Sequence, residues 1–242
     1  MNKIMRPLSA PVKTTWRDVV NRIVPLYDQL TGYYNSLGYV KLAGTGLVED
    51  VRASTLINCK GDILNTIAFL KILMHFGEHP EQEETFRILT DVPDKIIVEK
   101  QLQQMGQHLK SSLVTMIQFR LDNMVRNILN SIKKGSARPS YASNIDVLLP
   151  LLQLSDTDRK NQILRVLQYM RNTYHNNGTH KVGKAINVHI ENLTFIFDMN
   201  CPIDCASWTH VIIAMKATFE VIFEILNCAR VKALPWPVPI HI

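Results

Sequence analysis

The feature that most constrains this chain is a long apolar repeat over residues 94–134. Apolar side chains recur there at spacings of three and four, in near-heptad order: Val98, Leu102, Met105, Leu109, Leu113, Met116, Leu121, Met124, Ile128 and Ile132. This period is typical of an α-helix with one buried face. A continuous helix over the segment would be about 60 Å long, which exceeds what a small core needs. Two interpretations stay open: Gly106 breaks the helix, or part of it packs against another subunit.

The same helical period recurs through most of the chain. It predicts further helices over residues 15–36, 49–76, 140–154, 156–175 and 206–229. Pro25 is expected to kink the first of these helices, and the stretch 77–80 is expected to end the second. Ser155 and Asp156 offer an N-cap for the helix that begins near residue 156.

Between residues 186 and 198 the period changes from helical to alternating. Two apolar runs that alternate with polar residues flank a Glu191-Asn192 turn: Ile186, Val188 and Ile190, then Leu193, Phe195 and Phe197. This pattern predicts a small β-hairpin. With no internal repeat and no linker-like stretch, we expect one all-α domain over residues 1–242. It is a helical bundle with the hairpin inserted before the last helix and an extended Pro-rich tail over 234–242.

The composition fits a folded chain, because 46% of the residues are hydrophobic and 20% are charged, which excludes disordered and collagen-like proteins. The most apolar stretch, 211–229, is interrupted by Lys216, Glu220 and Glu224, so it predicts an amphipathic helix and no membrane partner. Residues 1–10 hold no apolar run of the length that a signal peptide needs, so we expect a cytoplasmic protein. The cysteines are then expected to be reduced thiols: Cys59, Cys201, Cys205 and Cys228.

Common catalytic and metal-binding motifs are missing from the sequence. It contains no Walker loop and no GxGxxG, HExxH or GxSxG motif, which disfavours NTP hydrolysis, dinucleotide redox chemistry and zincin proteolysis. His75 and His79 have metal-ligand spacing, but the helix is expected to end between them. Cys201, Cys205 and His210 lack a paired motif, and the two thiols are expected to be buried under the last helix. We therefore expect no metal site and no cofactor.

The strongest local feature is the run Arg171-Asn172-Thr173-Tyr174-His175-Asn176-Asn177-Gly178. At about 100° per residue, Arg171 and His175 fall together on the border of the buried stripe of their helix. A guanidinium can hold two phosphate oxygens, and an imidazole can move a proton near neutral pH. The same residues also suit a helix end, because Asn-Asn-Gly favours the left-handed conformation and basic side chains neutralise the last carbonyls.

This run resembles the Arg/His motif of the HEPN superfamily (higher eukaryotes and prokaryotes nucleotide-binding domain). Its place on the penultimate helix of a bundle, and the hairpin and Pro202-Ile203-Asp204 that follow, are similar to bacterial HEPN-like proteins; the resemblance covers about residues 155–227. Many HEPN proteins are metal-independent endoribonucleases with toxin or phage-defence roles. In them, two protomers bring their Arg/His motifs into one cleft.

The resemblance implies roles for individual residues. Arg171 would stabilise charge on the scissile phosphate, and His175 would assist proton transfer during attack by the 2′-hydroxyl. It also implies that the partners are RNA, a second copy of the chain in a homodimer, and an antitoxin or defence-system protein. The formal net charge of +6, from 27 basic and 21 acidic residues, favours a polyanion. The supporting residues are Asn172 and Asn176, and the expected RNA contacts are Lys181, Lys184 and Arg165.

One departure from the family motif keeps other functions open. Only three residues separate Arg171 from His175, fewer than the family usually has. The alternative is a non-catalytic HEPN-like interaction or regulatory module, with the long helix of residues 94–134 as its contact surface. A third hypothesis is a nucleotide-binding domain that presents substrate to a separate nucleotidyltransferase.

Overall fold

The computed structural model of the chain describes residues 15–38, 50–90, 95–181, 184–203, 205–235 and 238. Within them, eight α-helices and one two-stranded antiparallel hairpin confirm the all-α prediction. The strands are β1 (Ile186–Ile190) and β2 (Leu193–Phe197), paired in the predicted register about the Glu191-Asn192 turn. The helices are α1 (Trp16–Ser36), α2 (Val51–Glu78), α3 (Glu83–Thr90), α4 (Lys95–Ile132), α5 (Tyr141–Leu152), α6 (Thr157–His175), α7 (Trp208–Asn227) and α8 (Ala229–Lys232).

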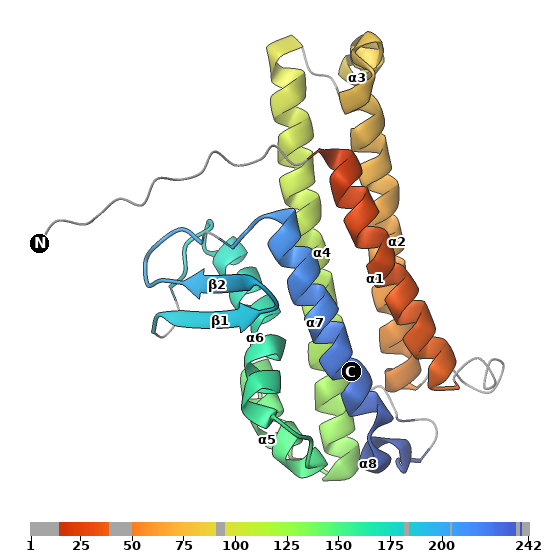
Figure 1. Ribbon diagram of the computed structural model, residues 1–242, viewed down its shortest axis with the longest axis vertical. Helices are drawn as coiled ribbons and strands as arrows, with labels where there is room; N and C mark the ends of the chain where they lie inside the picture. The colour runs from red at the N-terminus through yellow and green to blue at the C-terminus, as the bar shows by residue number, and fades with distance from the viewer. Residues whose placement is uncertain are drawn as a thin grey trace, which may run out of the picture.

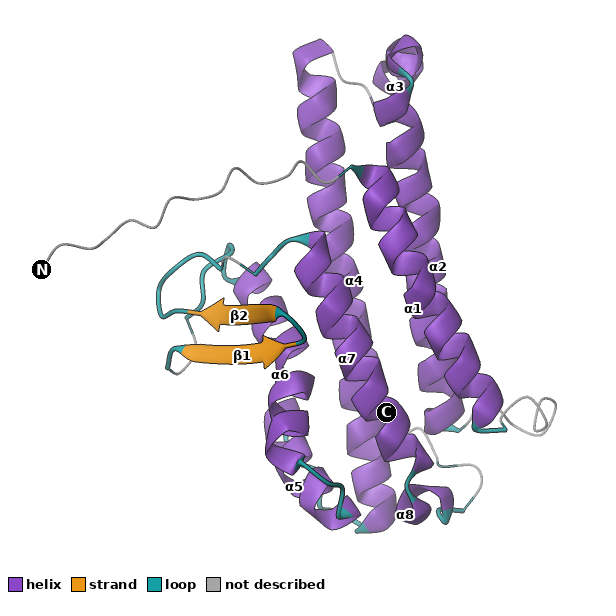
Figure 2. Cartoon of the chain, viewed as in Figure 1, coloured by secondary structure: helices purple, strands orange, loops and turns teal. Residues whose placement is uncertain are grey.

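Four long helices form the body of the fold. Figure 1 shows α1 in front of α2 and α7 in front of α4, and each of the four helices packs on two of the others: α1 on α2 and α7, and α4 on α2 and α7. Helices α5 and α6 and the hairpin lie beside α4 and α7, and α3 lies at one end of α2 (Figure 2). Apolar side chains from every one of the long helices and from both strands meet in one continuous core. Within the described residues, no helix has both the length and the apolar character to cross a bilayer.

Local polar contacts set the beginnings of several helices. The Thr15 hydroxyl accepts from the Asp18 N–H, and the Asp18 carboxylate accepts from the Thr15 N–H, which forms a capping box at α1. Ser140 and Ser207 cap α5 and α7 through their hydroxyls. Asp156 is the N-cap residue of α6, as predicted, but its backbone is left-handed (φ 50°) and its side chain makes no capping bond.

Several predicted boundaries differ from the structure. The sequence interpretation missed α3 and the short 3-10 helix Pro80–Gln82, because both are shorter than the window in which a helical period becomes visible. The predicted last helix is divided, because Cys228 is extended (ψ 147°) between α7 and α8. Pro25 lies inside α1, which continues through it as one helix. Some predicted features lie outside the described residues: the helix starts at residues 49 and 94, Asp204, and most of the tail over 234–242.

Gly106 does not break the long helix, because α4 continues through it for 38 residues. Position 106 has room only for a glycine, because another side chain packs against the helix backbone there. A Cβ atom at position 106 would overlap the indole ring of Trp16, which lies directly on the helix backbone. Of the two interpretations, helix breaking at Gly106 is therefore wrong.

We expect Gly106→Ala to lower the free energy of unfolding by about 1–3 kcal/mol, because the indole must move out of a packed position. Urea denaturation measures this loss. The matched control is Gly32→Ala in α1, where a Cβ atom has no neighbour within 4 Å and the higher helix propensity of alanine should raise stability slightly. Equal effects of the two substitutions would contradict the close approach of Trp16.

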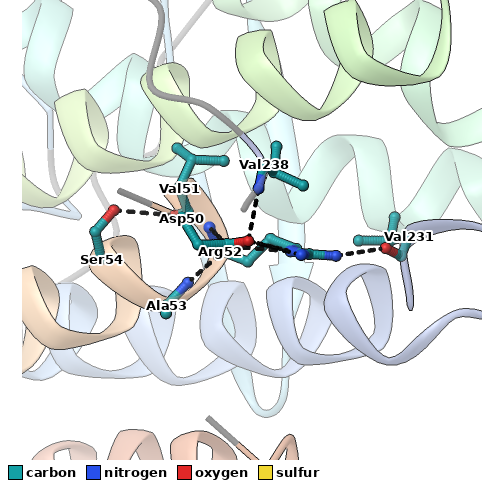
Figure 3. Close-up of polar contacts among 7 residues, drawn as sticks. All are labelled: Asp50, Val51, Arg52, Ala53, Ser54, Val231 and Val238. Carbon is teal, nitrogen blue, oxygen red and sulfur yellow. Dashed lines mark hydrogen bonds and ion pairs between the residues drawn. The ribbon is translucent and has the colours of Figure 1, made fainter. Parts of the chain in front are cut away.

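A buried ion pair lies at the start of α2, and hydrogen bonds connect it to the chain near residues 231 and 238 (Figure 3). The fully buried Asp50 carboxylate lies 2.6 Å from Arg52 Nη2, and it also accepts from the Val238 N–H at 2.7 Å. Arg52 Nη1 donates to the Val231 carbonyl at 2.9 Å, and the Val51 N–H donates to the Val238 carbonyl at 2.9 Å. We call Asp50, Arg52, Val231 and Val238 the Asp50 clasp.

Candidate functional site

The end of α6 is closed by its own backbone. The Asn176 N–H donates to the carbonyls of Asn172 and Thr173, and the Gly178 N–H donates to the Thr173 carbonyl at 2.9 Å. Asn177 and Gly178 are left-handed, with φ of 54° and 79°. The predicted Asn-Asn-Gly helix end is therefore confirmed. Because the backbone satisfies these carbonyls, the side chains of Arg171 and His175 are not needed as caps.

Arg171 is held by an aromatic ring and not by an acid. Its guanidinium carbon lies 4.8 Å from the centre of the Phe119 ring on α4, a distance typical of a cation–π contact. The side chain is half-buried, and its Nε atom is buried without a hydrogen-bond partner. In the part of the chain that the structure describes, the guanidinium has no ion pair within 4.0 Å. The contact with Phe119 thus orients Arg171 while leaving its N–H donors available.

Arg171 forms one wall of a polar cavity of about 200 Å³ between α4, the start of α5 and α6. Five of the residues around it carry a buried polar atom that has no hydrogen-bond partner. Buried polar groups in folded proteins are nearly always hydrogen-bonded, so a cavity with this lining suits a polar guest. We call it the Arg171 cavity, and its lining residues are Gln118, Phe119, Asp122, Pro139, Ser140, Tyr141, Gln168 and Arg171; the five unpartnered atoms are Gln118 Oε1, Asp122 Oδ1, Tyr141 Oη, Gln168 Oε1 and Arg171 Nε.

Two acidic groups of the Arg171 cavity favour their protonated forms. Burial raises the pKa of the Asp122 carboxyl, although the nearby charges of Arg126 and Arg171 oppose this shift. Burial also raises the pKa of the Tyr141 phenol, which is therefore a hydrogen-bond donor at neutral pH. The cavity thus combines a cation, a phenol donor and three acceptor oxygens.

His175 lies one helical turn beyond Arg171, on the solvent side of the border. Its ring is exposed and makes no hydrogen bond or ion pair to any of the described residues, and it does not line the Arg171 cavity. Asn172 and Asn176 are half-buried. The structure therefore leaves His175 accessible beside a guanidinium that is fixed in place.

The three basic residues expected to contact RNA have different surroundings. Lys181 and Lys184 are exposed in the segment that follows α6. Arg165 instead pairs with Asp146 at 2.6 Å and also donates to the Ala142 carbonyl at 3.4 Å. Their role as RNA contacts stays a prediction for all three. The two lysines are open to a phosphate chain as they stand, whereas Arg165 would have to share its guanidinium with Asp146.

The residues considered as metal ligands do not come together as a set of three or more among the described residues, although the His75 and His79 rings lie side by side with centroids 4.6 Å apart. Helix α2 ends at Glu78 between His75 and His79, as predicted, and the His79 ring contacts Glu81 at 2.8 Å. Cys205 is buried as predicted, whereas Cys201 is exposed, so that part of the prediction is wrong. Among the described residues, no group of three or more His, Cys, Asp or Glu side chains is placed to hold a metal ion.

A second hollow, of about 220 Å³, lies between α6, the hairpin turn and α7. Three of its charged residues are already paired: Lys160 lies 3.1 Å from Glu224, and Glu191 accepts from Lys216 at 2.7 Å. None of its lining residues has a buried polar atom without a partner. This hollow is therefore less suited to a guest than the Arg171 cavity.

Sequence reasoning singled out Arg171 but missed most of the cavity around it. Gln118 and Asp122 lie one turn apart and interrupt the apolar repeat of α4, which was the available signal. Tyr141 and Gln168 carry no such signal, because a tyrosine at a helix start and a glutamine on an amphipathic helix are ordinary. His180 is buried and contacts the rings of Tyr169 and Phe197.

Comparison of the chain with protein-family models, with curated proteins and with solved structures finds no match. The likeness to the HEPN superfamily therefore depends on the residues of α6 and of the segments that follow it.

Proposed function

We propose that this chain binds RNA at the exposed end of α6 and cleaves its phosphodiester backbone without a metal ion. One observation carries the proposal: the half-buried Arg171 guanidinium, held against Phe119, lies one helical turn from an exposed His175 that has no hydrogen-bond or ion-pair partner among the described residues. A fixed cation beside a free imidazole is the pair of groups that phosphodiester cleavage uses.

The chemistry follows from what each group can do. The 2′-hydroxyl oxygen attacks the adjacent phosphorus, and the bond from phosphorus to the 5′-oxygen breaks, which yields a 2′,3′-cyclic phosphate and a 5′-hydroxyl. Arg171 donates to the phosphate oxygens as negative charge grows on them. His175 moves one proton, either from the 2′-hydroxyl or to the leaving 5′-oxygen. The second copy of the motif that the HEPN resemblance implies would supply the other proton transfer.

Two surface features support a nucleic acid as the substrate. The exposed Lys181 and Lys184 lie six and nine residues after His175, in the segment that follows α6, and would add positive charge for a phosphate chain bound at this end of the helix. The chain as a whole carries a formal charge of +6. Positive charge of this kind attracts a polyanion from solution and makes its binding salt-dependent.

We expect the wild-type protein to cleave total RNA or labelled tRNA in the presence of EDTA and to leave 2′,3′-cyclic phosphate ends. Arg171→Ala should abolish this cleavage, because the growing charge on the phosphate loses its donor. The matched control is Arg159→Ala, which removes an exposed arginine from the other end of the same helix and should leave the rate unchanged. Circular dichroism melting shows whether each variant is folded.

Two results would overturn the proposal. One is a folded Arg171→Ala variant that cleaves as fast as the wild type. The other is a wild-type protein that cleaves neither total RNA nor tRNA when it is assayed with EDTA and with added divalent cations.

A non-catalytic interaction module is the second candidate function, and one observation favours it. Helix α2 exposes the large apolar side chains of Leu64 and Phe69 to 51% and 55%. Exposed apolar groups of this size commonly mark contact surfaces. With this function, neither Arg171→Ala nor His175→Ala would change any enzymatic activity.

A further inference from the structure

A line of apolar side chains runs along the outward face of α2. Helices α1 and α4 pack against the other sides of α2, as Figure 1 shows, and the outward face is left uncovered by the described elements. The large side chains on this face are Ile57, Leu64 and Ile72, exposed to 40%, 51% and 48%. A helix with apolar side chains on two opposite faces usually packs against other protein on both of them. We call Ile57, Gly61, Leu64, Ala68 and Ile72 the α2 stripe.

The α2 stripe continues onto α4. Asp62 on α2 contacts Arg120 on α4 at 3.4 Å, which places the two helices edge to edge there. Met116 lies one turn before Arg120 and is 39% exposed, so it extends the apolar surface. Helix α2 has 28 residues and is about 42 Å long. A standard interface buries roughly 800 Å² per partner, which is more area than one face of a single helix offers. The added surface of α4 brings the patch closer to that size.

The α2 stripe contains no charged side chain, and the exposed Lys71 lies at its edge. The Asp62 carboxylate and the Arg120 guanidinium at its edge neutralise each other. The Lys60 ammonium is turned away toward α1, where it lies 5.1 Å from the centre of the Tyr27 ring. The polar residues within the face are Asn58 and Asn65, whose amides both donate and accept. In the arrangement described below, the two copies of Lys71 would be about 20 Å apart, so they would repel each other only weakly.

Residues of similar size follow one another in the same order in both directions from the middle of the α2 stripe. Counted outward from the point between Leu64 and Asn65, Gly61 and Ala68 are equally distant, and so are Ile57 and Ile72. An antiparallel copy related by a two-fold axis at that point would place Gly61 against Ala68 of the second copy and Ile57 against Ile72 of the second copy. Leu64 and Asn65 would each face the same residue of the second copy. The small pair then lies where the two backbones come closest, which allows helix axes about 8–10 Å apart.

We infer that two copies of this chain associate through the α2 stripe, antiparallel about a two-fold axis between Leu64 and Asn65. A closed interface of this kind needs a surface that is complementary to itself, which the repeat of sizes and the paired amides supply. Helix α4 separates α2 from α6, so this contact leaves Arg171 and His175 of both copies open. It is therefore distinct from the meeting of motifs that the HEPN resemblance implies, and it does not depend on the proposed function.

Light scattering after size exclusion tests the association. The wild-type protein should approach twice the chain mass of 27.7 kDa as its concentration rises. Leu64→Glu should weaken the association a hundredfold or more, because two like charges would face each other across the axis. Leu89→Glu on α3 is the matched control, since it also replaces an exposed leucine and should leave the dimer intact. A wild-type monomer at every concentration, or a wild-type mass that Leu64→Glu leaves unchanged, would overturn the inference.

Cysteine cross-linking tests the antiparallel arrangement. In a Cys201→Ala background, which removes the exposed native thiol, Asn65→Cys should give a covalent dimer on mild oxidation, because the two positions lie about one residue apart along the helix axis. Asn58→Cys should not cross-link, because its two copies would be about 20 Å apart. Cross-linking of both variants would show a parallel contact instead. Cleavage by the Leu64→Glu variant separates the two proposals, because the α2 stripe lies apart from Arg171 and His175 and this variant should keep whatever ribonuclease activity the wild type has.

Discussion

Replacing His175 with alanine is expected to slow RNA cleavage by about a hundredfold to ten-thousandfold, the usual contribution of a general acid or base. The imidazole is exposed, and among the described residues it has no hydrogen-bond or ion-pair partner, so its removal takes away a proton carrier without disturbing any contact. The melting temperature should therefore stay the same. Single-turnover cleavage of labelled tRNA in EDTA measures the rate, and added imidazole should restore part of it.

The control for this prediction is His108→Ala, which removes an exposed imidazole from α4 and should cleave at the wild-type rate. A His175→Ala variant with full activity would remove His175 from the mechanism. If the His175→Ala variant loses activity, melts at a lower temperature than the wild type and is not restored by imidazole, His175 has a structural role.

Replacing Asp50 with alanine is expected to lower the free energy of unfolding by about 3–5 kcal/mol, because the Arg52 charge would stay buried without its partner. The Arg52 side chain is only 6% exposed, and two of its nitrogens donate to the Asp50 carboxylate within 3.0 Å. Asp50 is also the N-cap of α2, where its carboxylate accepts from the Arg52 N–H at 2.8 Å. Urea denaturation followed by circular dichroism measures the loss.

Two further variants show whether the buried charge is the cause. Asp18→Ala removes an exposed carboxylate from the capping box of α1 and should lose much less stability than Asp50→Ala. The double variant Asp50→Ala with Arg52→Met should be more stable than Asp50→Ala alone, because no uncompensated charge is left inside. If Asp50→Ala loses no more stability than Asp18→Ala, the Asp50 clasp contributes nothing beyond a helix cap.

Elements whose signals are local could be predicted from the sequence. The end of α6 at His175 and both strands of the hairpin follow from a helix-ending Asn-Asn-Gly and from strict alternation over five residues in each strand. The start of α1 at Trp16 follows from Thr15 and Asp18, which cap it within one turn. In these cases the residues that decide the structure are neighbours in the chain.

Features made by residues far apart in the sequence could not be predicted. Gly106 was interpreted as a possible helix break because the sequence cannot show that Trp16 packs on it. The Arg171 cavity joins side chains of α4, α5 and α6, and only Arg171 carried a signal of its own. Exposure is also decided by tertiary packing, which is why Cys201 is exposed although its spacing to Cys205 suggested a shared environment.

The Asp50 clasp also bears on the order in which the chain can fold as it is made. The Asp50 carboxylate takes a hydrogen bond from Val238, which lies 188 residues later. At a synthesis rate of about 5–20 residues per second, residue 238 is added about 10–40 s after Asp50. Until then Asp50 and Arg52 can form their ion pair, but the hydrogen bonds to the backbone of Val231 and Val238 cannot form. The first turn of α2 is thus among the last parts of the described fold to reach its final contacts on the ribosome.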